Sequence, residues 1–188
     1  MATIDAFFSW TEHIFIHLAI LLRKITTGAE VASLADSNWE TKFKSSLDIS
    51  DPKTKVLFDN LIEIRRQHRN FIAHGAFGKR GEAFSFHSGI GAVPVLLPHH
   101  RGKQRFALTS NETYEDPAAL KVIQDFLEHL WSGARAPARL YLQRSSLPLI
   151  LTMATDGTYQ RAMQSVEDMQ ELVDHLSREW DRAANMDW

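Results

Sequence analysis

Residues 51–75 read DPKTKVLFDNLIEIRRQHRNFIAHG, and this stretch predicts one long helix. Asp51 is a good capping residue for the first turn, and a proline directly after it suits a helix start. Gly75 is a typical helix stop, so we expect the helix to run to about His74. One side is predicted to carry residues that recur at helical spacing, namely Val56, Leu57, Asn60, Leu61, Ile64, His68, Phe71 and Ile72.

Residues 1–25 predict a second long helix. Ile16 and Ile20 add apolar surface outside its main stripe, as expected of a central bundle helix or of a subunit contact. Glu12, His13 and His17 interrupt the apolar run, so we expect no transmembrane span. The stretch lacks a basic n-region and a cleavage site, so we expect no targeting segment. The main stripe consists of Ile4, Phe7, Phe8, Thr11, Ile14, Phe15, Leu18, Leu21, Leu22 and Ile25.

The remaining segments complete a mainly α fold. Ser37–Glu40 has the pattern of a capping box, and further helices are expected from Asp116, Pro137 and Ser165. Residues 76–115 are rich in glycine and short alternating runs, which predict a small β-hairpin or sheet insertion. Asp-Gly between strand-like runs predicts a possible second hairpin near 148–163. We therefore expect a single helical-bundle domain over residues 1–188.

Composition narrows the function classes. The 188 residues contain no cysteine, which excludes disulfides and thiolate metal sites and favours a reducing, cytoplasmic setting. The formal net charge of −2 gives no overall attraction to nucleic acid or membrane. Residues 61–80 carry five lysines and arginines against Glu63 alone, whereas residues 165–188 are acidic. This asymmetry indicates one face suited to an anion, although two solvated helix faces would give the same pattern.

The end of the 51–75 stretch combines groups that can handle phosphate. On a helix, Arg66, Asn70 and His74 lie four residues apart on one face, and Arg69 lies one residue round from them. A guanidinium can bind two phosphate oxygens at once, and a histidine can transfer a proton near neutral pH. RNA supplies its own 2′-hydroxyl nucleophile, so cleavage there would need no metal or other cofactor.

The segment RNFIAH, residues 69–74, resembles the signature of the HEPN superfamily, an arginine followed after four to six residues by a histidine. The resemblance implies a dimeric α-helical bundle and a metal-independent endoribonuclease, as in toxin and defence systems. It implies that Arg69 and His74 are catalytic and that Asn70 orients them, with two copies meeting in one site. In one toxin branch a tyrosine that is modified stands two residues after the histidine, where this chain has Ala76.

The expected partners are RNA, a second copy of the chain, and possible antitoxin or other protein partners, with no membrane. Contacts to phosphate are expected from five basic residues, Arg65, Arg66, Arg101, Lys103 and Arg105. A non-catalytic interaction or RNA-binding module of the same fold remains the alternative. A further alternative is an unrelated helical protein. There His74 would simply bond the last carbonyls of its helix, and Arg69 would be a solvated charge.

Other side chains give weaker signals. His99 and His100 could ligate a metal together with His87 or His74, which leaves a metal-dependent enzyme open as a third class of function. Zinc usually takes carboxylates or thiolates as well, and adjacent histidines in a polar loop are more often exposed, so no metal ligand is assigned. There is no phosphate-binding glycine loop of the nucleotide-binding type and no G-x-S-x-G motif. Core anchoring is expected of the tryptophans in predicted helices or beside caps, which are Trp10, Trp39, Trp131 and Trp180.

Overall fold

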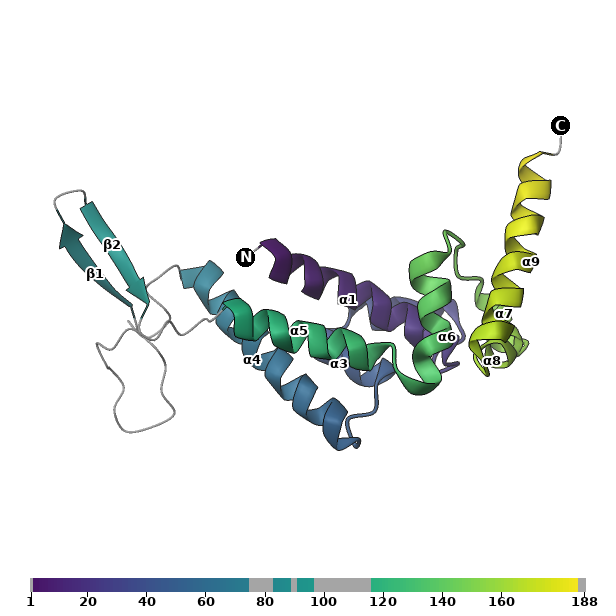
Figure 1. The fold of residues 1–188 in the computed structure, drawn as a ribbon, viewed down its shortest axis with the longest axis horizontal. Coiled ribbons are helices and arrows are strands. Elements are labelled where there is room, and N and C mark those ends of the chain that lie inside the picture. The colour runs from purple at the N-terminus through teal and green to yellow at the C-terminus, as the bar shows by residue number, and fades with distance from the viewer. Residues whose placement is uncertain (1, 75–82, 89–90, 97–115, 186–188) are drawn as a thin grey trace. The chain divides into compact units, whose positions relative to one another are not determined.

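The computed structural model describes residues 2–74, 83–88, 91–96 and 116–185, with side chains over 4–66 and 119–185. This part of the chain is mainly helical, as predicted (Figure 1). The chain divides into two compact units. One comprises Val56–Phe126, and the other comprises Ala2–Lys55 together with Leu127–Trp188. The prediction of a single domain stays a prediction.

The N-terminal helices form an aromatic core within the second unit. Helix α1 (Ala2–Leu21) packs against α2 (Gly28–Asp36) and α3 (Trp39–Ser46). Trp39 and Phe43 of α3 are fully buried, and each meets Phe15 of α1 with ring centroids 5.5 and 5.3 Å apart. Phe8 packs edge-on against Trp39 at 5.4 Å. The predicted apolar stripe is therefore a core stripe from Ile4 to Leu21, whereas its last members, Leu22 and Ile25, follow the end of α1 and are half-buried.

Helix α1 is long and apolar enough to cross a membrane by length and composition alone. Of the window Ile4–Leu21, however, 56% is buried inside the protein. A core helix meets the same criterion, and the packing of α1 against α3 gives it this role here.

The turn after α1 has an unusual backbone. Arg23 adopts a left-handed conformation with φ of 56°, although it is not a glycine. Its backbone N–H donates to the carbonyl of Ile20. Its guanidinium donates to Gln160 Oε1 at 3.1 Å and to the carbonyl of Thr155 at 3.4 Å. These bonds connect the end of α1 to a segment far along the chain.

The capping pattern differs from the prediction at the start of α3. The N-cap is Asn38, whose side chain accepts from the N–H of Thr41, and Ser37 instead ends α2. A reciprocal capping box occurs one helix earlier, where Thr27 and Glu30 bond each other's backbone at the start of α2. Ser, Asn and Thr compete for this role over a few residues, so the pattern alone does not choose between them.

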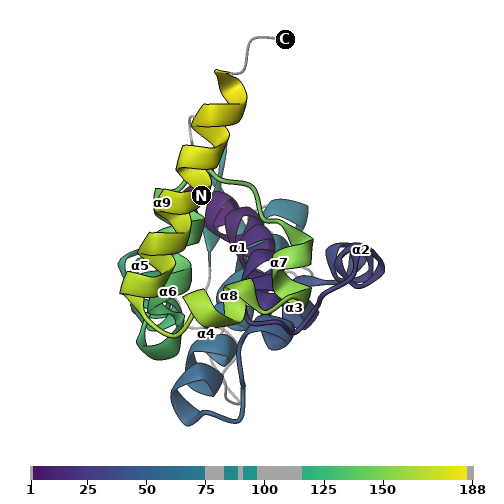
Figure 2. The ribbon, with the colours of Figure 1, turned by 90° about the vertical axis from the view of Figure 1, so that its right-hand side faces the viewer.

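The second half of this unit contains short helices beneath a long one. The 3-10 turn η2 (Gly133–Arg135), α6 (Ala136–Arg139) and the π-helical turn η3 (Leu140–Arg144) follow one another. Helix α9 (Val166–Ala184), capped by Ser165 as predicted, contacts α6, η3 and α8 (Thr158–Ala162). Figure 2 shows α9 extending beyond these neighbours.

The hairpin predicted near 148–163 is wrong, because the segment forms two short helices, α7 (Leu151–Thr155) and α8 (Thr158–Ala162). Gly157 provides a left-handed link between them with φ of 84°, and Asp156 accepts from the N–H of Thr158. Asp-Gly favours a positive-φ turn, which can join helices as well as strands. Burial of Tyr159 and Ala162 against neighbouring helices decides the outcome.

The other unit contains most of α4 (Pro52–His74), strands β1 (Ala83–Ser88) and β2 (Gly91–Leu96), and most of α5 (Asp116–Leu130). The strands pair antiparallel, with Ala83 opposite Leu96 and Ser88 opposite Gly91. The buried face of α4 is rotated from the predicted one. Val56 is 59% exposed and Asn60 is exposed, while the buried apolar residues are Leu57, Phe58, Leu61 and Ile64.

Candidate functional site

Helix α4 carries the candidate site, and local chemistry explains its start. Asp51 precedes Pro52, and its Oδ2 accepts from the N–H of Thr54 at 2.7 Å and from the Thr54 hydroxyl at 2.8 Å. These bonds satisfy donors that the first helical turn leaves without a partner. The helix spans Pro52–His74, which confirms the predicted extent.

The helix arranges the predicted catalytic residues along its last turns. Positions 66, 70 and 74 follow one another at four-residue spacing, and position 69 is rotated by about 100° from position 70. The side chains of Arg69, Asn70 and His74 lie outside those that the structure describes. Their assignment as a catalytic group therefore stays a prediction carried by helix position and residue type.

The two arginines that precede the motif are described and differ in their surroundings. Arg66 is exposed and donates from Nη2 to both carboxylate oxygens of Glu63, at 2.8 and 2.6 Å. Arg65 is half-buried. Because an exposed pair of this kind is weak, a phosphate could displace Glu63 at little cost. The other predicted phosphate contacts, Arg101, Lys103 and Arg105, lie outside the described residues, as do His99 and His100.

No family model matches this chain, and no curated protein or solved structure matches it.

A second polar cluster, which no sequence pattern indicates, holds the opposite end of α4. His129 at the end of α5 is buried, and its Nε2 lies 2.7 Å from the Thr54 hydroxyl. Since that hydroxyl donates to Asp51, the arrangement assigns the proton to Nε2, which donates to Thr54. Seventy-five residues separate the two side chains, so no local pattern could have revealed the contact.

The charges around His129 favour its neutral form. Burial lowers the pKa of His129, and the nearby cations Arg135 and Lys53 lower it further, while Asp51 opposes them. Arg135 also donates to the carbonyls of His129 and Leu130, at 2.7 and 2.9 Å, and so caps α5. Asp51 is exposed, but its bond to Thr54 and the contact of Thr54 with the buried His129 join the start of α4 to the end of α5, so we interpret this cluster as a structural latch.

The described residues contain no group of three or more metal-binding side chains. His13 and His17 lie four residues apart on α1. Burial lowers the pKa of His17, and the neighbouring His13 adds to this effect. Two imidazoles do not complete a zinc site, which requires three or four ligands.

Proposed function

We propose that this chain is a metal-independent endoribonuclease that resembles the HEPN superfamily in its motif. The observation that carries the proposal is that α4 presents RNFIAH in its last turns and spans as far as His74. Arg65 and Arg66 stand one turn before the motif and give RNA a basic approach. The proposal includes a HEPN-like bundle with a β insertion at about 76–115, acting in the cytoplasm.

In the proposed reaction the 2′-hydroxyl of RNA attacks the adjacent phosphorus and the 5′-oxygen of the next nucleotide leaves. His74 transfers the proton, which a histidine can do near neutral pH. Arg69 stabilises the charge that develops on the phosphate oxygens. Asn70 orients these two groups. The products are a 2′,3′-cyclic phosphate and a free 5′-hydroxyl, and no water enters the first step.

We test this reaction with the purified chain and a labelled RNA in EDTA. Cleavage should persist, and the products should end in a 2′,3′-cyclic phosphate. His74→Ala and Arg69→Ala should each lower the rate by about 10²–10⁴-fold, the usual range for general acid–base catalysis. Asn70→Ala should cost less, because it acts through its neighbours.

Matched controls come from α9, where His175 and Arg178 are exposed. His175→Ala and Arg178→Ala should leave the cleavage rate unchanged. Cleavage that stops in EDTA would instead favour a metal site formed by the histidines of residues 87–100. If the wild-type chain cleaves no RNA, the proposal of an enzyme fails, and the chain is better described as a non-catalytic RNA-binding or interaction module.

The proposal requires two copies of the chain, because the family site is built from two motifs. We propose a two-fold dimer with α1 or α4 in the interface, burying on the order of 2,000 Å² or more, as obligate dimers do. Light scattering at micromolar concentration should report twice the chain mass. A monomer at this concentration would exclude a site built from two copies of the motif.

Residues 99–105 are proposed to attract phosphate without taking part in the chemistry. Replacing Arg101, Lys103 and Arg105 together should weaken RNA binding and flatten its salt dependence by about one unit of slope for each lost contact. Binding measured at several salt concentrations checks this. An unchanged slope would exclude the segment from RNA binding.

A further inference from the structure

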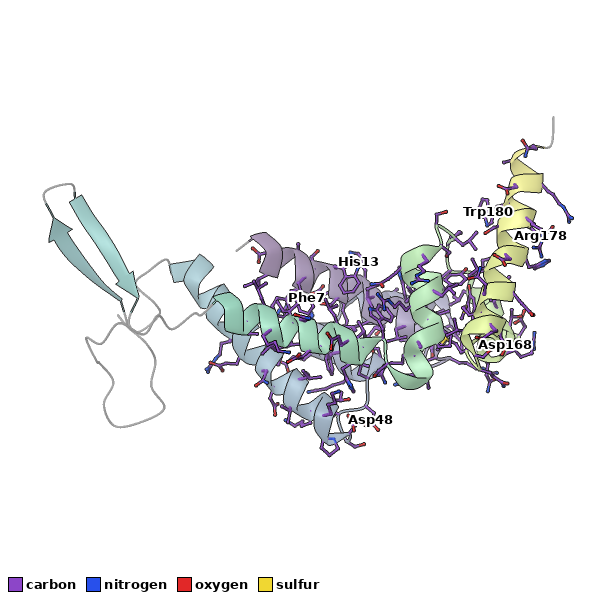
Figure 3. The ribbon with its side chains drawn as sticks, viewed as in Figure 1. Phe7, His13, Asp48, Asp168, Arg178 and Trp180 are labelled. Atoms are coloured by element: carbon purple, nitrogen blue, oxygen red, sulfur yellow. The ribbon has the colours of Figure 1, made fainter. Side chains whose placement is uncertain are left out.

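The apolar stripe of α9 continues past the point where the helix is covered. Met169, Val173 and Leu176 are buried where α9 contacts α6, η3 and α8. Trp180 follows Leu176 by four residues and therefore lies on the same stripe, but it is 52% exposed. This exposure corrects the expectation that Trp180 anchors the core. Figure 3 shows Trp180 on the part of α9 that lies beyond α6 and α8.

The outer end of α9, residues 177–184, contains no buried residue. Ala183 and Ala184 are exposed and extend the stripe by one more turn. Among the side chains that the structure describes, Trp180 is the only exposed large aromatic. Single exposed apolar residues are common, but a core stripe that continues onto an exposed tryptophan is characteristic of an interaction surface.

The charge of α9 indicates what this surface can meet. The helix has six acidic residues and two arginines, a difference of 2 − 6 = −4. Glu179 and Asp181 adjoin Trp180 and lie about 100° to either side of it around the helix. Arg178 lies near the opposite face, and Arg182 pairs with Glu179 at 2.7 Å. Nucleic acid and anionic lipid would be repelled, and a second α9 would bring like charges together.

We propose that the outer end of α9 docks, with Trp180 as its anchor, into an apolar groove of a different protein whose rim carries lysines and arginines. An amphipathic helix laid into a groove is a common mode of recognition, in which residues on one stripe serve as anchors. The carboxylates of Glu179 and Asp181 would face the basic rim. This surface does not depend on the ribonuclease proposal, so either can fail alone.

The probe is a fluorescein-labelled amphipathic peptide with leucines on one face and lysines on the other, titrated with the full chain by fluorescence anisotropy. Binding should be saturable and should weaken as salt increases. Trp180→Ala should weaken it by about 10-fold or more, as expected for a buried aromatic anchor. The matched control is Val166→Ala, which removes another exposed apolar side chain of α9 and should change nothing.

Charge is tested by exchange. The double variant Glu179→Lys, Asp181→Lys should lose the lysine peptide and gain a peptide in which glutamates replace the lysines. Absence of saturable binding, equal binding of both peptides by the wild-type chain, or an unchanged affinity in Trp180→Ala would each overturn the proposal. A lower melting temperature of Trp180→Ala would show that the tryptophan belongs to the core. Self-association that requires Trp180 would show that the partner bound at the outer end of α9 is a second copy of the chain.

Discussion

The hydroxyl of Tyr159 lies 3.3 Å from that of Tyr141, and together they form a continuous hydrogen-bonded chain. The N–H of Ile150 donates to Tyr159 at 2.8 Å, and Tyr141 donates to the carbonyl of Pro148 at 2.8 Å. Tyr159 must therefore donate to Tyr141. Burial and the bond to Tyr159 raise the pKa of Tyr141, so the Tyr141 phenol stays neutral. The two buried tyrosines thereby fix the backbone of Pro148 and Ile150 through hydrogen bonds.

We expect Tyr159→Phe to lower the free energy of unfolding by about 1–3 kcal/mol, because it leaves the partly buried Ile150 N–H without its acceptor. Urea unfolding followed by circular dichroism measures the loss. A change below about 0.5 kcal/mol, the size typical of surface substitutions, would contradict this role.

Thr11 is predicted to be essential for the aromatic core. It is fully buried, accepts from Trp39 Nε1 at 2.9 Å and donates to the carbonyl of Phe8 at 3.0 Å. Thr11→Val keeps the shape but leaves the indole N–H unpaired, which should cost about 1–3 kcal/mol of stability. Thr11→Ser keeps the hydroxyl and should lose less. Equal losses in the two variants, measured by urea unfolding, would show that packing decides and the hydrogen bond does not.

Two lysine–glutamate pairs provide a matched comparison. Lys42 Nζ lies 2.9 Å from Glu12, and its side chain is only 7% exposed, whereas the pair of Lys44 and Glu40 is exposed with 3.8 Å between charged atoms. Glu12→Gln should destabilise the protein by about 1–3 kcal/mol, because it leaves a buried ammonium without its counter-charge. Glu40→Gln should stay within about 0.5 kcal/mol. Thermal unfolding of both variants checks the difference, and similar values would refute it.

Stability should fall as the pH drops below about 6.5. The pKa of His129 is lowered in the folded protein, whereas in the unfolded chain it is the ordinary histidine value of about 6.5. As the pH falls below this value, the unfolded chain binds a proton more readily than the folded protein does, and this destabilises the fold. Melting temperatures between pH 7.5 and 5 measure the slope. His129→Gln keeps an amide donor for Thr54 but cannot titrate, so the slope should become shallower.

Part of the slope should remain in His129→Gln, because the pKa of His17 is lowered as well. The control is His175→Gln, at an exposed position of α9, which should leave the slope unchanged. The carboxyl of Asp51 also has a lowered pKa, owing to its bonds from Thr54, but its contribution is lost only below about pH 4. If the melting temperature of His129→Gln changes between pH 7.5 and 5 as steeply as that of the wild-type protein, the stabilising role of neutral His129 is disproved.

Sequence patterns predicted the long helices well because each has its own signals. Asp51 and Ser165 cap α4 and α9, and periodic apolar residues run the length of α1. The patterns failed where long-range packing decides. On α4, the predicted and the observed buried faces are related by a rotation of about one residue around the helix. In the segment near 148–163, where a hairpin was predicted, the burial of Tyr159 favours helices.

The candidate site was predicted only in part. The helix position of the RNFIAH motif followed from local sequence, and α4 places it as expected. The contact between Thr54 and His129 could not be predicted, because it depends on how the ends of α4 and α5 meet. The exposure of Trp180 could not be predicted either, since its spacing from Leu176 matches the spacing of the buried residues before it.

The left-handed turn at Arg23 has a consequence for the order of folding events. A non-glycine residue in this conformation costs on the order of 1 kcal/mol, and the two partners of its guanidinium lie 132 and 137 residues away in the chain. Contacts of such separation form only after a large loss of chain entropy. The turn should therefore become ordered late, in the same step that brings α7 and α8 to the end of α1. In pulse-labelling hydrogen exchange, the N–H of Lys24, which donates to the carbonyl of Ala19 in this turn, should gain protection after the amides within α1.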